Sequence, residues 1–285
     1  MTFPSATLLA QSALSGVFIG ALYGLLGLGL GLTWGLLHII NLAHFGFAFL
    51  AAYLCYQLAS VHGVDPLATL ALIMPLFFVA GVALQFLLER FRVSPLNSLL
   101  ATFGVTAIIE AAIQGVWTAD FRKLESVYAG QKLQIGELFV PIPELMTLLV
   151  ALVLSFGLWA AMRYTDLGRA MRALAADAPM AAAFGINRSA HAILLSGVCG
   201  ALAGIAGVCL ALGFTLTPSQ IYAWIGVVFA AVMLGGLGSA LGPLVAGIII
   251  GLSEAITMAF ASPSWAPIVS FTLLIVLLLL RPART

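Results

Sequence analysis

Long apolar segments separated by short polar breaks occupy most of this chain. Each is close to the roughly 20 residues that an α-helix needs to cross the hydrocarbon core of a bilayer. The pattern therefore predicts membrane-spanning helices. Their expected positions are about 8–37, 43–60, 67–88, 96–118, 143–162, 190–213, 221–239, 241–260 and 266–280.

Composition agrees with this pattern. The chain is 63% hydrophobic and 7% charged, with a mean hydropathy of +1.17, whereas soluble proteins average about 45–50% apolar and about 25% charged residues. We predict an all-α, polytopic membrane bundle of about eight or nine helices, forming a single domain over residues 1–285. The first apolar segment lacks a positive flank and is too long for a cleaved signal, so it should remain as a span. The three cysteines lie inside apolar segments and have no metal-type spacing.

Lys and Arg positions predict the orientation, because cytoplasmic loops are enriched in them. One set would share the cytoplasmic side: Arg90, Arg92, Arg163, Arg169, Arg172, Arg188, Arg281 and Arg284. The other set would lie outside: Arg122, Lys123 and Lys132. The loops at 89–95 and 163–189 are then cytoplasmic, and the N-terminus and the loop at 119–142 are external. This requires an odd number of spans, which fails if GGLGSALGP at 235–243 is a re-entrant loop rather than a turn.

Glycines recur on one face of the first predicted span. They are spaced by three or four residues: Gly16, Gly20, Gly24, Gly27, Gly31 and Gly35. Small residues allow helices in a membrane to approach closely. We expect another helix to pack on this face, either as a fixed seam or as a surface that slides during transport.

The fourth predicted span carries a polar stripe on one face, with a residue every four positions: Thr102, Thr106, Glu110, Gln114 and Thr118. A carboxylate within the bilayer costs several kcal/mol unless it faces a cavity or a partner. Glu110 is therefore a candidate for a translocation path, and an interhelical hydrogen-bond clamp or a buried neutral acid is the alternative. Glu254 follows Gly247 and Gly251 on a close-packed face, which favours a structural role.

Polar residues also interrupt the chain between the first two spans. His38, Asn41 and His44 stand three residues apart. Two histidines without a nearby carboxylate or thiolate form a poor metal site. These residues are more typical of a broken or re-entrant helix, whose free backbone groups must be satisfied within the protein.

The polar segment at 177–191, DAPMAAAFGINRSAH, predicts a short helix outside the membrane. Asp177 can cap its start, Pro179 suits its first turn, and Gly185 can close it in the left-handed conformation. Met180 and Phe184 then form an apolar face that has no core of its own. We expect this face to contact a partner protein.

Several catalytic motifs are absent from the sequence. No lysine follows a GxxxxG pattern, so the chain has no P-loop for ATP hydrolysis. GxSxG and HExxH are also missing. We expect neither an enzyme active site nor a cofactor on this chain, and no nucleic-acid partner.

Four segments resemble the permease subunits of branched-chain amino-acid ABC importers of the LIV type. They are IINLAHFGFAFLAAYL, LLATFGVTAIIEAAIQ, DLGRAMRALAADAPMAAAFGIN and MLGGLGSALGPLVAGIIIGLSE. The resemblance implies a permease in the bacterial inner membrane. It implies as partners two ATP-binding subunits, a periplasmic substrate-binding protein and a second permease chain, identical or related.

The resemblance also implies site residues. The loop helix would couple the ATPase to the bundle through Asp177, Ala181, Ala182, Gly185 and Ile186. The candidate translocation path does not come from the resemblance but from the polar residues within or next to the predicted spans: Asn41, His44, Thr102, Thr106, Glu110, Gln114 and Glu254. ATP would be bound by the partner subunits.

One motif departs from the family pattern. Relatives usually read NFAHGE or NFAHGD, whereas this chain reads NLAHFGF, with Phe45 and Gly46 in place of glycine and an acidic residue. Asn41 and His44 are kept. The fold inference is unaffected, while the cargo can be a branched-chain amino acid or a related small solute such as urea, a short amide or an aromatic acid.

A proton-coupled secondary transporter is the main alternative, with Glu110 carrying the coupling proton. It would need no ATP, and it would leave the capped loop helix without a function. An integral-membrane enzyme would need a tighter cluster of ionisable residues than two separate glutamates.

Overall fold

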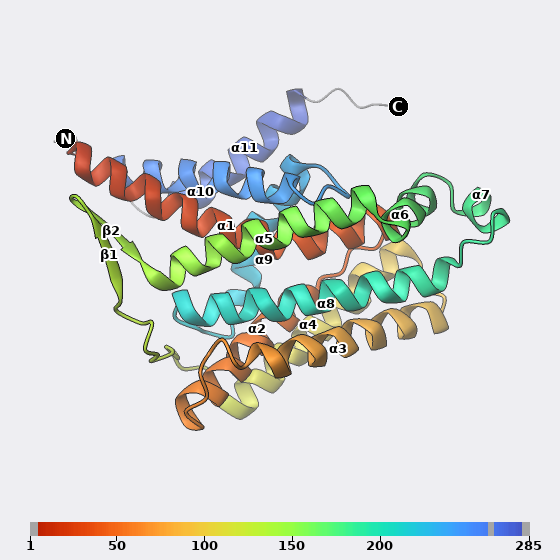
Figure 1. The fold of residues 1–285 in the computed structure, drawn as a ribbon, viewed down its shortest axis with the longest axis horizontal. Coiled ribbons are helices and arrows are strands. Elements are labelled where there is room, and N and C mark those ends of the chain that lie inside the picture. Colours follow the sequence, from red (N-terminus) through yellow and green to blue (C-terminus); the bar gives the residue numbers. More distant parts are fainter. Residues whose placement is uncertain (1–4, 262–264, 281–285) are drawn as a thin grey trace.

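The structure is a computed structural model that describes residues 5–261 and 265–280. Most of its helices run along the long axis of the molecule (Figure 1). The elements are α1 (Ala6–Leu37), α2 (Ala43–Tyr56), a π-helical turn η1 (Gln57–Val61), α3 (Leu70–Arg90), α4 (Pro95–Trp117), β1 (Lys132–Ile135), β2 (Leu138–Pro141), α5 (Ile142–Tyr164), α6 (Asp166–Ala176), α7 (Ala178–Ala183), α8 (Arg188–Gly213), α9 (Gln220–Gly235), α10 (Gly242–Phe260) and α11 (Ala266–Leu280).

The helical membrane fold predicted from the sequence is confirmed. In the described part of the chain, 7 helices are long and apolar enough to cross a membrane, counting α2 and η1 as one. The two remaining predicted spans are present as shorter apolar helices, α9 of 16 residues and α11 of 15.

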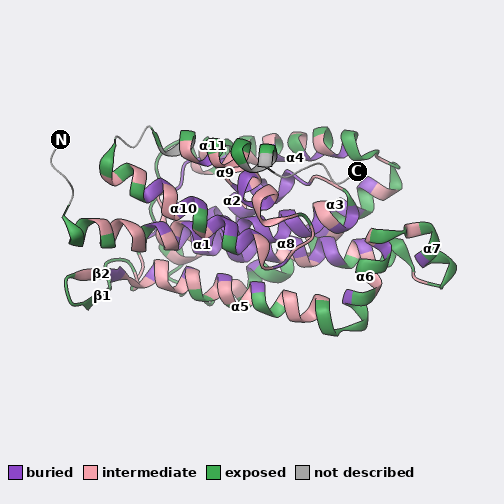
Figure 2. Cartoon of the chain, turned by 90° about the horizontal axis from the view of Figure 1, so that it is seen from above, coloured by how far each residue is buried: buried purple, intermediate pink, exposed green. Residues whose placement is uncertain are grey.

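α1 and α8 form the centre of the bundle (Figure 2). The hydroxyl of Ser5 caps the start of α1 by accepting a hydrogen bond from the Leu8 N–H at 3.2 Å. The helix ends at His38, whose positive φ of 59° turns the chain away. α3, α4 and α5 bury only one side each, as expected of helices on the outside of a membrane bundle.

The glycine face of α1 packs against α10, which confirms the predicted close approach. A Cβ added at Gly20 would lie 2.4 Å from the Gly247 carbonyl oxygen, and one at Gly16 would lie 2.7 Å from that of Gly251. Gly35, farther along the same face, meets the backbone of Gly238. Only glycine allows backbones to approach this closely.

The GGLGSALGP segment is a turn between two antiparallel helices. α9 runs parallel to α1, because Tyr23 contacts Trp224 and the later Trp34 contacts the later Phe229. α10 runs antiparallel to α1, because the contacts between them follow the reverse order. Gly236 and Gly238 have positive φ angles of 91° and 77°. The Gly238 N–H donates to the Gly31 carbonyl at 3.0 Å, which fixes the turn on α1.

The two ends of the bundle carry different extramembrane elements (Figure 1). At one end, β1 and β2 form an antiparallel hairpin that the sequence did not lead us to expect. Gln11 holds this hairpin to α1 through two hydrogen bonds with the Phe139 backbone, at 2.9 and 3.0 Å. α6 and α7 lie at the other end, together with the connection between α3 and α4. Arg281 and Arg284 lie outside the described residues.

Candidate coupling and translocation sites

The extramembrane helix α7 has the local geometry that its sequence predicts. The Asp177 carboxylate accepts a hydrogen bond from the Met180 N–H at 3.0 Å and caps the helix, with Pro179 in the first turn. Gly185 follows the helix with a φ of 84°. The Ile186 N–H then donates to the Ala181 carbonyl at 3.2 Å and closes the C-terminal end.

α7 exposes its apolar side chains. Met180 is 58% exposed and Phe184 is 81% exposed, while Ala181 is buried and Ala182 is exposed. The helix contacts α6 and projects from the end of the bundle (Figure 1). Apolar side chains this exposed outside the membrane are typical of a protein-binding surface.

α6 was not recognised as a separate helix in the sequence. The Thr165 hydroxyl caps it by accepting a hydrogen bond from the Gly168 N–H at 3.1 Å. Met171 belongs to an apolar cluster with Leu36 of α1 and Ala192 of α8. α6 therefore anchors α7 to two central helices of the bundle. Two features of the sequence could have predicted α6: the capping residue Thr165 and the three-residue spacing of the apolar residues Met171 and Leu174.

The break between α1 and α2 is held by α4. Residues 38–42 are not helical. The Thr102 hydroxyl of α4 accepts a hydrogen bond from the Leu42 N–H at 3.0 Å and lies 3.2 Å from the Ile40 carbonyl, to which it can donate. The broken-helix interpretation of this segment therefore holds. Thr102, rather than a histidine, satisfies the free backbone groups.

Asn41 and His44 lie inside the bundle. His44 is fully enclosed against Gly29 of α1, where an added Cβ would lie 2.4 Å from the imidazole Cε1. Its ring donates to the Leu26 carbonyl, which leaves Nε2 without a hydrogen-bond partner among the described residues. The Asn41 Oδ1 is likewise buried and unpaired in this part of the chain, and Asn41 lines a small pocket with Thr33.

The polar stripe on α4 is divided between two environments. Thr102 and Thr106 are buried. Glu110 is half-buried and Gln114 and Thr118 are exposed. The Gln114 amide donates to the Glu110 carboxylate at 3.1 Å, and the hydroxyl of Tyr222 on α9 interacts with the same carboxylate. The exposed part of the stripe therefore lies on the outer surface of a single chain.

Glu254 joins three helices. Its carboxylate accepts hydrogen bonds from the Tyr23 hydroxyl of α1, at 2.9 Å, and from the Ser270 hydroxyl of α11. It is buried among them. This agrees with the structural role that the sequence favours.

The structure brings together some of the candidate path residues and separates others. Asn41 and Thr102 adjoin the helix break, and His44 follows one turn later. Glu110 lies two turns along α4 from Thr102, beside α9. Glu254 lies at the α1–α10–α11 contact, and no hydrogen bond among the described residues joins it to the other candidates.

A bundle of apolar helices long enough to cross a membrane, with a short helix projecting from one end, defines a multi-pass membrane protein. The sequence profile of the family described as the permease component of branched-chain amino acid transport systems matches residues 12–278. The chain belongs to this family. Its members are permease subunits of ABC importers, and the family implies partnership with ATPase and binding-protein components.

Curated relatives match almost the full chain. The high-affinity branched-chain amino acid permease LivH of Salmonella typhimurium is 27% identical, over 95% of this chain and 93% of LivH. BraD of Pseudomonas aeruginosa is 26% identical, over 95% of this chain and 94% of BraD. A probable LivH of Methanocaldococcus jannaschii is 27% identical over 90% of this chain and 86% of its own length. No solved structure matches the chain significantly.

Proposed function

We propose that this chain is a permease subunit that imports a branched-chain amino acid or a related small solute, with energy from separate ATPase subunits. The observation that carries the proposal is α7, a helix capped at both ends that projects from the bundle with Met180 and Phe184 exposed. Family membership and the cargo named for the relatives support it.

The coupling role belongs to α7 and its C-terminal turn. An ATPase subunit would receive the apolar side chains on α7, with Asp177, Ala182 and Gly185 shaping the contact. Movement of α7 would reach the bundle through α6, because Met171 packs against α1 and α8. ATP would be bound by two partner subunits, and this chain would carry no cofactor and no ATPase site.

The passage for substrate would form between this chain and a second permease chain, identical or related. Support comes from α4, whose half-buried Glu110 and exposed Gln114 lie on the outer surface of the single chain. Polar groups placed there would face lipid unless a second chain covered them. Asn41, His44 and Thr102 would act from within the bundle, by holding the α1–α2 break beside this surface.

The orientation follows the positive-inside rule. The end with α6 and α7 would face the cytoplasm of a bacterial inner membrane. The opposite end, with the β1–β2 hairpin, would receive substrate from a periplasmic binding protein. That receptor would set most of the specificity, which suits a permease with few polar groups in its spans.

The departure at Phe45 and Gly46 has an indirect bearing on the cargo. Phe45 is fully buried, and a Cβ at Gly46 would lie 3.3 Å from the Thr106 Cα on α4. Both residues therefore pack α2 within the chain. Their effect on the passage would come through the position of α4.

The test is co-purification of the tagged chain with its ATPase subunits in mild detergent, followed by an ATPase assay. Met180→Asp/Phe184→Asp should abolish both, because charges replace the exposed apolar contacts. Val127→Asp is the control, since Val127 is 78% exposed in the loop at the opposite end. Equal ATPase recovery with the α7 variant would refute the coupling role.

A second pair of variants tests the shape of the contact. Gly185→Val should uncouple ATP hydrolysis from transport, because a β-branched residue is strained at a φ of 84°. Gly185→Asn should retain more activity, since asparagine tolerates this conformation. Identical transport by both variants would argue against the assigned role of this turn.

A further inference from the structure

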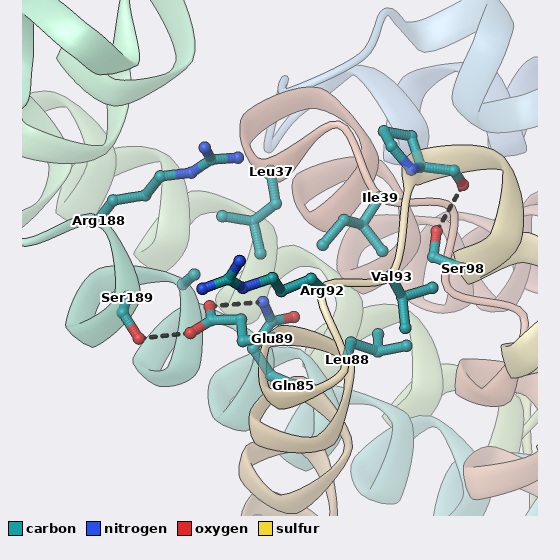
Figure 3. A pocket seen from close by; sticks show the side chains of 12 residues that line it. Leu37, Ile39, Gln85, Leu88, Glu89, Arg92, Val93, Ser98, Arg188 and Ser189 are labelled. Carbon is teal, nitrogen blue, oxygen red and sulfur yellow. Dashed lines mark hydrogen bonds between the residues drawn. The ribbon is translucent and has the colours of Figure 1, made fainter.

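A pocket of about 420 Å³ opens at the same end of the bundle as α6 and α7. It lies between the end of α1, the connection from α3 to α4, and the start of α8. Figure 3 shows the guanidinium groups of Arg92 and Arg188 extending into this space from two different elements. None of its lining residues lies on α7 or is a member of the polar stripe on α4, although Ser98, one turn before Thr102, lines it.

Both arginines are available to bind a ligand. Among the described residues, neither side chain has a hydrogen-bond or ion-pair partner. Glu89, the acidic residue in the pocket, forms no ion pair with either arginine among the described residues. Its carboxylate accepts hydrogen bonds from the Gln85 amide at 2.9 Å and from the Ser189 hydroxyl. The pocket lining therefore carries two arginines without ion-pair partners and one carboxylate, so its net charge is positive.

The backbone at Arg92 is unusual. Its φ of 48° places a non-glycine residue in the left-handed region, which glycine or asparagine usually occupies after a helix. The chain thus retains an arginine where its side chain is conformationally costly. Strained residues of this kind gather at functional sites.

Apart from Ser98, the remainder of the pocket lining is apolar. Leu37, Ile39, Leu88 and Val93 line its wall. Phe91 and Leu96, on either side of the α3–α4 connection, are 74% and 71% exposed. The pocket therefore combines positive charge with apolar surface at one end of a membrane bundle, where phospholipid headgroups meet acyl chains.

We propose that this pocket binds an anionic phospholipid, with its phosphate between Arg92 and Arg188 and its acyl chains against the apolar wall and the exposed side of α3 and α4. The N-terminal ends of α4 and α8 both border the pocket, and the positive ends of their helix dipoles favour an anion, although Ser94 and Asn187 cap part of their N–H groups. Basic pockets between helices at the membrane surface are suited to such headgroups. The proposal requires only that the bundle lies in a membrane, so it does not rest on the proposed transport function.

Lipid is favoured over a soluble phosphate because of the apolar surface. A free phosphate would use the two arginines and leave the exposed Phe91 and Leu96 beside the pocket uncovered. A phospholipid covers both kinds of surface at once. A zwitterionic lipid would place its own positive charge near the arginines, so an anionic headgroup should bind more tightly.

The test uses the detergent-purified full chain with short-chain phosphatidylglycerol, phosphatidylcholine or inorganic phosphate, and follows the melting temperature. Phosphatidylglycerol should raise it by about 5 °C at roughly one hundred times the dissociation constant. Arg92→Gln/Arg188→Gln should weaken the apparent affinity about 25-fold, or roughly fivefold for each charge removed. Both arginines are exposed and unpaired in the described chain, so the variant should fold normally.

Arg163→Gln/Arg169→Gln is the matched control, because it removes the same charge at the same end, away from the pocket. It should keep the parent affinity. Equal protection by phosphatidylcholine would overturn the proposal, as would unchanged lipid affinity in the pocket variant. Protection by inorganic phosphate alone would assign the site to a soluble anion. No lipid effect, together with loss of ATPase subunits from the pocket variant, would assign the arginines to a protein contact.

Discussion

At the residue scale, one hydroxyl joins α4 to the break between α1 and α2. Thr102 accepts a hydrogen bond from the Leu42 N–H and lies within reach of the carbonyls of Ile40 and, at 2.8 Å, Ser98. Replacement by valine keeps the shape but leaves the buried Leu42 N–H without a partner. An unsatisfied buried group of this kind costs about 1–3 kcal/mol. Thr102→Val should therefore lower the free energy of unfolding by about that amount, measured by denaturant titration in detergent.

Thr106→Val is the control for this experiment. Thr106 is equally buried on the same helix, but its hydroxyl donates only to the Thr102 carbonyl of its own helix, at 2.9 Å. That carbonyl keeps its helical partner after the substitution. The control should cost less than Thr102→Val, and equal losses would show that Thr102 does not hold the break between α1 and α2.

A second residue-scale prediction concerns the loop before α3, outside the spans. The Tyr128 hydroxyl donates to the Asp65 carboxylate at 2.9 Å, and the Leu67 N–H donates to it at 2.8 Å. The tyrosine bond, followed by the backbone bonds, lowers the pKa of Asp65 below its usual value. Since the folded pKa is the lower one, this interaction stabilises the loop above about pH 3.9 and is lost as the pH falls through the folded pKa.

Tyr128→Phe should therefore raise the pKa of Asp65 towards its ordinary value. Protection of the Leu67 amide against hydrogen exchange should then disappear at a higher pH than in the parent. Tyr164→Phe, which removes an exposed hydroxyl at the opposite end of the bundle, should leave this profile unchanged. If the profile of Tyr128→Phe coincides with that of the parent, Tyr128 is not the group that lowers the pKa.

Residue-scale features were predictable where they depend on neighbours in sequence. The cap at Asp177 and the left-handed Gly185 could be predicted because capping is local. The contact of the Thr102 hydroxyl with the α1–α2 break could not be predicted, because it depends on α4 packing beside residues 40–42. The spacing of the stripe on α4 identified a polar face, but not its division between a buried and an exposed part.

At the element scale, the α1–α10 seam depends on backbone contact between two helices. Gly20→Ala would place a methyl group 2.4 Å from the Gly247 carbonyl oxygen, which belongs to the backbone and cannot rotate away. Overpacking of this kind costs about 1–3 kcal/mol. The melting temperature should fall by several degrees. Gly104→Ala on α4, where an added Cβ meets nothing within 4 Å, should leave stability unchanged or raise it.

This pair of variants separates packing from helix propensity. Both replace a glycine by alanine in the interior of a helix, so both gain the same propensity. Only the first adds a contact with another helix. Equal melting temperatures for the two variants would contradict the backbone contact between α1 and α10.

Element positions could largely be predicted because hydropathy is a local property of the chain. The first span was expected at about 8–37 and is Ala6–Leu37. The elements that were missed lie outside the apolar segments, where that signal is absent. The β1–β2 hairpin has a glycine at its turn, Gly136, with a φ of 63°. α6 has a threonine cap. Each signal is a single residue, and glycine and threonine are also common in polar loops. Neither residue alone therefore predicts a hairpin or a helix.

At the scale of the whole molecule, pairing between distant segments determines the architecture. The glycine face of α1 indicated that some helix packs there, but α10 lies more than 200 residues farther along the chain. The same pairing buries Glu254 against Tyr23 and Ser270, and leaves Glu110 at the surface of a single chain. Two glutamates that look alike in the sequence thus lie in different environments: Glu254 joins three helices, and Glu110 lies half-buried at the surface of the chain.

The source of energy for transport can be tested at Glu110. In an ATP-driven permease this carboxylate needs only to be polar, so Glu110→Gln should retain most uptake and the parent pH profile in proteoliposomes that contain the ATPase subunits. In a proton-coupled carrier it must titrate, so the same variant should lose uptake and its pH dependence. Glu125→Gln, in an exposed loop, is the matched control. Because Gln114 already donates to Glu110, a glutamine there can still accept that bond through its carbonyl oxygen. A severe loss of uptake would therefore come from the missing proton site rather than from a broken contact, and would favour the proton-coupled mechanism.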